Sequence, residues 1–231
     1  MKMIVSSFYN TLIDEEGAIP TSTMFTLDEY KKNGSLFTVL TNRDIDEVLY
    51  YDESFPFIDY IISFNGSIIY DVNRRVVLRK KELDDNTISK VEELLSDYEI
   101  LYYTEDGVFE NRVDSVLKIE VKLPKKNKKI IDICKDNGIN YSILKINKEL
   151  YLEISPSTFK DALNSLLDNL KINTKEILGI IGNDSDIDLI NYLDNCYVVS
   201  NASKELKSKT KKRTKSNTSK GVEYLLKKIK K

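Results

Sequence analysis

The chain contains no histidine among its 231 residues. This absence excludes Ser-His catalytic triads, histidine general bases and histidine metal ligands. Any acid–base chemistry must therefore come from carboxylates, lysines or tyrosines. Cysteine is scarce as well, because Cys134 and Cys196 are the two in the chain, and they lie far apart without a metal-binding spacing. Each lies in an apolar run, so both are expected to be core residues of a protein in a reducing compartment.

Long hydrophobic runs are also missing. The first residues lack the apolar stretch of a signal peptide, and no later run is long enough to cross a bilayer. We therefore expect a cytoplasmic protein without a membrane partner. The composition, 41% hydrophobic and 31% charged, is that of an ordinary globular protein and argues against disorder. The sequence indicates no particular oligomeric state.

Charge is distributed unevenly, although the formal net charge is only −2. Residues 203–231 hold 12 Lys or Arg and two Glu, so this segment carries +10 and the remaining residues carry −12. Two lysine-rich helices with solvated faces would account for this segment, and a polyanion-binding surface is the alternative. Apart from Tyr224, no aromatic residue lies among these lysines to stack on bases, so nucleic acid is not an expected partner.

Apolar runs alternate with amphipathic stretches, a pattern typical of an α/β fold with a mostly parallel sheet. Buried strands are expected at residues 3–5, 36–40 and 60–64. From about residue 80 the pattern changes to short alternating segments, which predict a small α+β insert with an antiparallel sheet. The α/β rhythm resumes after Pro156. The sequence therefore predicts a core domain from residues 1–80 and 156–231, with a cap domain inserted at residues 81–155.

Several short motifs occur in a fixed order along the chain. They are Val5–Leu12, Val39–Arg43, Asn65-Gly66, Leu152–Ser155 followed by Lys160, Ile181–Ile187 and Ser200–Ala202. Together they resemble the Cof-type subfamily of haloacid dehalogenase-like (HAD) phosphatases, over nearly the whole length of the chain. The resemblance implies a Rossmann-like core with a parallel sheet and an inserted α+β cap. In such sheets, ligands bind at the carboxyl ends of the strands.

The first motif departs from the family at both catalytic positions. The family has Asp-x-Asp-x-Thr there, in which the first aspartate attacks phosphorus and binds Mg²⁺ and the second acts as general acid and base. Ser7 and Tyr9 occupy these positions. A serine without an adjacent base or a carboxylate for the metal is a poor substitute, and a tyrosine with a pKa of about 10 is a poor proton shuttle near neutrality. We therefore expect Ser7 and Tyr9 to be non-functional in catalysis.

The phosphate-binding parts match the family better. Asn10 and Thr11 fit the loop whose backbone amides would surround a phosphate. Thr41 matches the family's phosphate-binding hydroxyl and is followed by Asn42. Lys160 matches the lysine that neutralises the charge of the nucleophile and the phosphate. These five residues are the predicted phosphate-binding set.

The metal motif is incomplete. The family has Gly-Asp-x-x-Asn-Asp or Gly-Asn-Asp-x-Asn-Asp, whereas this chain has Gly182-Asn183-Asp184-Ser185-Asp186, one residue shorter and without the second asparagine. Asp184 and Asp186 are the predicted metal ligands. Because Mg²⁺ prefers near-octahedral oxygen ligands and the family takes one from the first motif, we expect weak or absent Mg²⁺ binding.

These observations predict a catalytically impaired HAD-like protein that retains binding of a small phosphorylated ligand. One alternative is an active Mg²⁺-dependent phosphomonoester hydrolase, of the sugar-phosphate type, with an altered active site. The other is a non-enzymatic interaction protein that uses the basic C-terminal region. The fold alone does not choose among them, and the sequence identifies no substrate.

Overall fold

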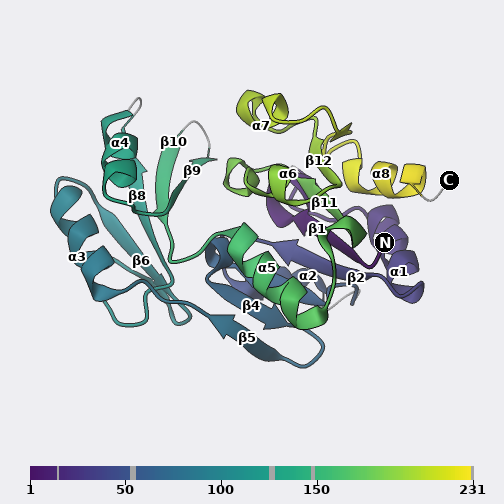
Figure 1. Ribbon diagram of the computed structural model, residues 1–231, viewed down its shortest axis with the longest axis horizontal. Coiled ribbons are helices and arrows are strands. Elements are labelled where there is room, and N and C mark those ends of the chain that lie inside the picture. Colours follow the sequence, from purple (N-terminus) through teal and green to yellow (C-terminus); the bar gives the residue numbers. More distant parts are fainter. Residues whose placement is uncertain (15, 53–55, 125–127, 147–148, 230–231) are drawn as a thin grey trace.

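The computed structural model describes residues 1–14, 16–52, 56–124, 128–146 and 149–229, which form two sheets with helices packed against them (Figure 1). The strands of the larger sheet are, in order across it, β13 (Arg213–Thr214), β12 (Cys196–Val199), β11 (Ile177–Ile181), β1 (Met3–Ser7), β2 (Leu36–Leu40), β3 (Tyr60–Ser63), β4 (Ile68–Asp71) and β5 (Val76–Lys80). Pairing is parallel from β13 to β3, and β4 and β5 are added antiparallel. The predicted α/β fold with a mostly parallel sheet is confirmed.

The smaller sheet is antiparallel. Its strands are, in order, β7 (Gly107–Phe109), β6 (Ile100–Thr104), β8 (Lys118–Leu123), β10 (Glu149–Ile154) and β9 (Tyr141–Ile146). The two helices beside it are α3 (Asp85–Leu94) and α4 (Lys128–Asp136). This sheet has an apolar cluster of its own, formed by residues between β5 and α5 (Figure 1).

The remaining helices accompany the larger sheet. They are α1 (Thr21–Lys32), α2 (Ile45–Asp52), α5 (Phe159–Leu170), α6 (Leu189–Tyr192), α7 (Lys204–Ser208) and α8 (Gly221–Ile229). In α5 the buried residues Phe159, Ala162, Leu163, Leu166 and Leu167 repeat at helical spacing, which fixes the face that the helix turns to the sheet. Among the described residues, no helix is long and apolar enough to cross a membrane.

The central strand β1 explains where the candidate site lies. All five of its residues are buried, as is usual for a parallel strand covered on both faces. Its neighbours are β2 and β11, and all three run in the same direction. Their carboxyl ends therefore meet at one edge of the sheet, where Ser7, Thr41 and Gly182 follow or end the strands.

The lysine-rich C-terminal segment is part of the larger sheet. It contributes the helices α7 and α8, and also the edge strand β13, which the sequence reasoning missed. Helix α8 packs beside α1, where Tyr30 Oη donates a hydrogen bond to the carbonyl oxygen of Leu226 at 2.7 Å. Ser22 Oγ donates to Glu223 Oε2 at 2.6 Å in the same contact.

Candidate functional site

Ser7 lies at the end of β1 in direct contact with a carboxylate. Its Oγ atom donates a hydrogen bond to Asp186 Oδ2 at 2.6 Å and accepts one from the Gly182 amide at 3.2 Å. The Asn183 amide donates to the same carboxylate oxygen at 3.1 Å. The expectation that Ser7 has no adjacent base was wrong, because the chain after β11 folds back and places Asp186 beside it.

Asp186 and Ser7 are both closed off from solvent, with exposures of 1% and 0%. Burial raises the pKa of Asp186 to about 6, and the hydrogen bonds from Ser7 and the backbone amides limit this rise. Near neutrality the group is therefore a carboxylate that depends on the Ser7 hydroxyl and on two backbone amides. Ser7, at the position of the family's nucleophile, therefore serves as a hydrogen-bond donor to the buried Asp186 carboxylate.

Tyr9 is fixed on the other side of the loop. Its hydroxyl donates a hydrogen bond to Glu47 of α2, and the Arg43 guanidinium carbon lies 4.8 Å from the centre of its ring. Burial raises the pKa of Tyr9 above the ordinary tyrosine value, and the Glu47 carboxylate raises it further. A hydroxyl that holds its proton this tightly is a poor acid–base group near neutrality.

Three asparagine side chains tie the loop together. Asn10 has a left-handed backbone (φ 59°) and its Nδ2 donates to Asn183 Oδ1 at 2.8 Å. Asn183 Nδ2 donates to the Tyr9 carbonyl at 3.2 Å, and Asn201 Nδ2 donates to the Asn10 carbonyl at 2.8 Å. Asn201 belongs to one of the motifs, but its contact with Asn10 could not be inferred from the sequence.

The remaining predicted phosphate ligands have different surroundings. Thr11 is buried, and its Oγ1 has no hydrogen-bond partner among the described residues. Thr41 Oγ1 accepts a hydrogen bond from the Arg43 amide at 3.1 Å, and Asn42 Nδ2 donates to Glu153 Oε1 at 2.9 Å. Lys160 is not brought to this group. It lies on the exposed side of α5, and its ammonium is 6.0 Å from the centre of the Tyr192 ring.

A buried ion pair next to Asn42 was missed by the sequence reasoning. Lys118 Nζ of β8 lies 2.8 Å from Glu153 Oε1 of β10, with side-chain exposures of 1% and 0%. Lys118 also donates to the Asn42 carbonyl at 3.1 Å, and Asn65 Nδ2 donates to Glu153 Oε2 at 3.0 Å. The pair therefore joins the smaller sheet to two loops of the larger one. Its only sequence signal is a lysine within the apolar run of residues 116–119.

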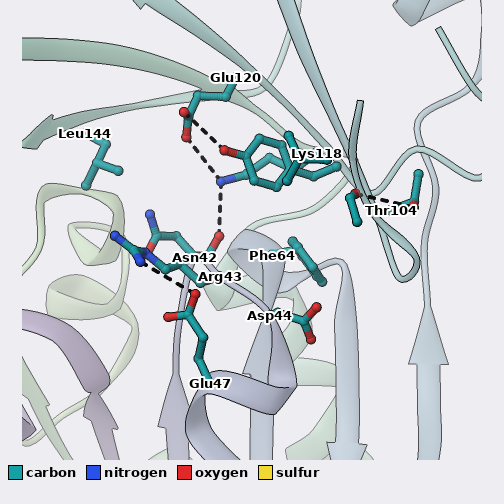
Figure 2. A pocket seen from close by; sticks show the side chains of 12 residues that line it. Asn42, Arg43, Asp44, Glu47, Phe64, Thr104, Lys118, Glu120 and Leu144 are labelled. Carbon is teal, nitrogen blue, oxygen red and sulfur yellow. Dashed lines mark hydrogen bonds and ion pairs between the residues drawn. The ribbon is translucent and has the colours of Figure 1, made fainter. Parts of the chain in front are cut away.

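A cavity of about 440 Å³ lies between the two sheets, beside this ion pair (Figure 2). Its charged lining residues are Arg43, Asp44, Glu47, Lys118 and Glu120. Figure 2 shows the contacts between them, with Arg43 3.5 Å from Glu47 and Lys118 3.5 Å from Glu120. Two cations thus face three carboxylates in the lining.

The residues at the end of β1 do not fit a magnesium ion. Asp186 is bound to Ser7, and the Asp184 carboxylate accepts a hydrogen bond from the Ser203 hydroxyl. Within the described ranges, no group of three or more acidic, histidine or cysteine side chains is placed to hold a metal ion. Mg²⁺ requires near-octahedral oxygen ligands at short distances, and here Ser7 supplies a neutral hydroxyl that already donates to Asp186.

Comparison with known proteins agrees with this fold. A family model described as haloacid dehalogenase-like hydrolase matches residues 4–150 and 110–226 in two overlapping segments. The chain therefore belongs to the haloacid dehalogenase-like hydrolase family. A search of curated proteins by sequence found no match.

Solved structures share the architecture at low sequence identity. A HAD-superfamily phosphatase from Bacteroides thetaiotaomicron, BT1666, has a TM-score of 0.85 at 16% identity, covering 100% of this chain and 95% of that one. A haloacid dehalogenase-like hydrolase from B. subtilis has a TM-score of 0.85 at 16% identity, covering 98% and 99%. The HAD subclass IIB sugar phosphatase BT4131 has a TM-score of 0.82 at 14% identity, covering 100% and 99%. These similarities confirm the fold class, and the family model confirms the predicted resemblance to the haloacid dehalogenase-like family.

Proposed function

We propose that this protein is a HAD-family member that lacks phosphomonoesterase activity. The proposal depends on the hydrogen bond between Ser7 and Asp186. Because both side chains are closed to solvent and bonded to each other, neither is free to contact a substrate or a metal ion. Loss of acid–base help alone typically lowers a rate by about 10²–10⁴, and loss of the covalent nucleophile adds to this. Tyr9, fixed on Glu47, does not replace the missing acid–base carboxylate.

Activation of Ser7 by Asp186 is the chemical alternative that their contact suggests. A carboxylate at hydrogen-bond distance from a hydroxyl has the geometry of a general base. Attack, however, requires the phosphorus to come within about 3–3.5 Å of the Oγ atom. The Ser7 side chain is fully buried, and its Oγ already has contacts with Asp186 and with the Gly182 amide. We therefore favour the non-catalytic function.

Binding of a small phosphorylated ligand is the role that we propose for the cavity between the sheets. Arg43 and Lys118 are its cations, and they would face the phosphate. Both already have carboxylate partners, and the lining includes Asp44, Glu47 and Glu120. Repulsion between these carboxylates and a dianion lowers the affinity, so we expect weak binding.

The test is phosphatase activity with Mg²⁺ on a panel of phosphomonoesters. The native chain is compared with a Ser7→Asp, Tyr9→Asp double variant, and thermal unfolding of both is measured with and without Mg²⁺. We expect no activity in the native chain and no Mg²⁺-dependent rise in its Tm. In the double variant a carboxylate at position 7 lies beside Asp186, so Mg²⁺ should raise the Tm even if turnover is not restored.

The outcomes separate the proposals. Turnover by the native chain would overturn the non-catalytic function and support the active hydrolase. An active double variant would show that only the two first-motif carboxylates are missing. If the double variant gains Mg²⁺ stabilisation but no turnover, the shortened loop at Asp184 and Asp186 is also deficient. Titration of the native chain with the same phosphomonoesters then tests ligand binding by itself.

A further inference from the structure

A second group of basic side chains lies outside the cavity between the sheets. Arg79 belongs to β5, Lys81 follows that strand, and Lys160 lies in the first turn of α5. All three line one hollow of about 540 Å³, which also includes Asp161, Asn164 and Tyr192. Three cations and one carboxylate thus surround this hollow. Its charge balance is the reverse of that in the cavity between the sheets.

Arg79 distinguishes this hollow from a patch of surface lysines. Its Nη2 donates a hydrogen bond to Ser157 Oγ at 2.9 Å, which holds the guanidinium in place. Its Nη1 is buried and has no hydrogen-bond partner within the described part of the chain. Burial lowers the pKa of Arg79, and the nearby Asp161 carboxylate only partly opposes this shift. A buried donor without an acceptor costs free energy, so this guanidinium has an unsatisfied donor beside the hollow.

Among the described residues, the two lysines form no ion pair, although the Asp161 carboxylate lines the same hollow. Neither Lys81 nor Lys160 forms an ion pair with a residue that the structure describes. Lys160 lies near the face of the Tyr192 ring, and Tyr192 Oη donates to Asn164 Oδ1 at 2.7 Å, so the ring is held in place. Both ammonium groups are therefore available to an anion that enters the hollow.

We propose that this hollow is a binding site for a phosphate group, held by the guanidinium group of Arg79 and by the ammonium groups of Lys81 and Lys160. A guanidinium and two ammonium groups match a dianion with several acceptor oxygens better than a monovalent carboxylate. The site joins β5 to α5, and Arg79 already contacts Ser157 in the segment that returns from the smaller sheet. A bound phosphate would thus connect both ends of the inserted segment.

The experiment is calorimetric titration of the native chain at low ionic strength, with inorganic phosphate and with glycerol 3-phosphate as probes. The variants are Lys160→Gln and Lys81→Gln, both at exposed positions where the fold should be unaffected. Lys175→Gln is the matched control, because it removes the same charge at an exposed lysine outside the hollow. We expect saturable binding by the native chain, weakened about tenfold or more in each variant and less than about twofold in the control.

The two probes distinguish the source of the phosphate. Binding of inorganic phosphate alone would assign the site to the free ion, and binding of both probes would assign it to a phosphate ester. Either result supports the site if the Lys160 variant loses affinity. Absence of saturation, an equal loss in Lys175→Gln, or saturable binding unaffected by Lys160→Gln would overturn the proposal. Because Lys160 does not contact Ser7 or Asp186, none of these results depends on phosphatase activity.

Discussion

Replacement of Lys118 by methionine tests how the protein holds the buried carboxylate of Glu153 between its two sheets. The charged atoms of the pair are 2.8 Å apart, and both side chains are almost completely buried. Methionine has about the length of lysine without its charge, so Lys118→Met removes the counter-ion with little change in volume. Hydrogen bonds to Glu153 from Asn42, Asn65 and Ser142 remain in the variant.

The expected loss follows from the uncompensated charge. Removing one partner of a buried ion pair costs about 3–5 kcal/mol. The three remaining hydrogen bonds place the loss near the lower limit, about 3 kcal/mol, or a decrease in Tm of about 6–12 °C for a chain of this size. In the native chain, burial would raise the pKa of Glu153, but Lys118 and the hydrogen bonds outweigh it and lower the pKa. Glu153 therefore stabilises the native chain above its unfolded pKa, and this stabilisation is lost as the pH falls.

The variant should respond to pH in the opposite direction. Without Lys118 the pKa of Glu153 rises, so protonation at low pH relieves the unpaired charge and the difference from the native chain shrinks. Urea unfolding at pH 7.5 and pH 5 measures this for the native chain, Lys118→Met, Glu153→Gln and the double variant. The double variant should recover about half or more of the free energy of unfolding that Lys118→Met loses, because neither charge remains. A loss below about 1 kcal/mol, or additive single losses, would refute the reasoning.

Two further predictions concern the loop around Ser7 and the junction between the sheets. Burial raises the pKa of Asp186 to about 6, so the folded state binds the proton more tightly than the unfolded state does. As the pH rises from 4 to 6.5, the free energy of unfolding of the native chain in urea should therefore fall, on the order of 1–3 kcal/mol. The Asp186→Asn variant should lack this fall, and parallel curves for the two chains would contradict the reasoning. Gly66 has φ +99°, and a Cβ there would lie 2.2 Å from the Thr158 carbonyl oxygen, whereas Gly34 has φ +83° and open space around it. Gly34→Ala should cost about 1 kcal/mol and Gly66→Ala about 3 kcal/mol or more, and equal losses in thermal unfolding would contradict the role of the contact.

The pattern of apolar residues predicted much of the fold because it reflects burial directly. The strand expected at residues 36–40 is β2 as observed, and the strand expected at 60–64 is β3, which ends at Ser63. Strand β3 stops there because Phe64 has a left-handed backbone, with φ 47°. Strand β13 was missed for a different reason. It has two residues, Arg213 and Thr214, and it exists through backbone pairing with β12 rather than through an apolar run of its own.

Some features of the candidate site could likewise be predicted from the sequence, and others could not. The resemblance implied a site at the carboxyl ends of the parallel strands, and the structure pairs Ser7 with Asp186 there. Lys160 matches the family lysine by its position in the motif, but its side chain does not point toward Ser7. Phe159 begins the buried stripe of α5, and the next residue along a helix is rotated by about 100°, so Lys160 faces away from the sheet. The Lys118–Glu153 pair was beyond sequence reasoning, because nothing local links two residues 35 positions apart.

The substitution at position 7 and the closed state of the loop are physically consistent with each other. Two carboxylates within hydrogen-bond distance cannot both ionise without a cation or a shared proton. With serine at position 7, one carboxylate remains at this point, and the hydroxyl donates a hydrogen bond to Asp186. The amides of Gly182 and Asn183 complete the arrangement. The hydrogen bond from the Ser7 hydroxyl thus stabilises the single buried charge of Asp186, as a metal ion would stabilise the charges of two paired aspartates. The chain after β11 can therefore pack against β1 even though its metal motif is shortened.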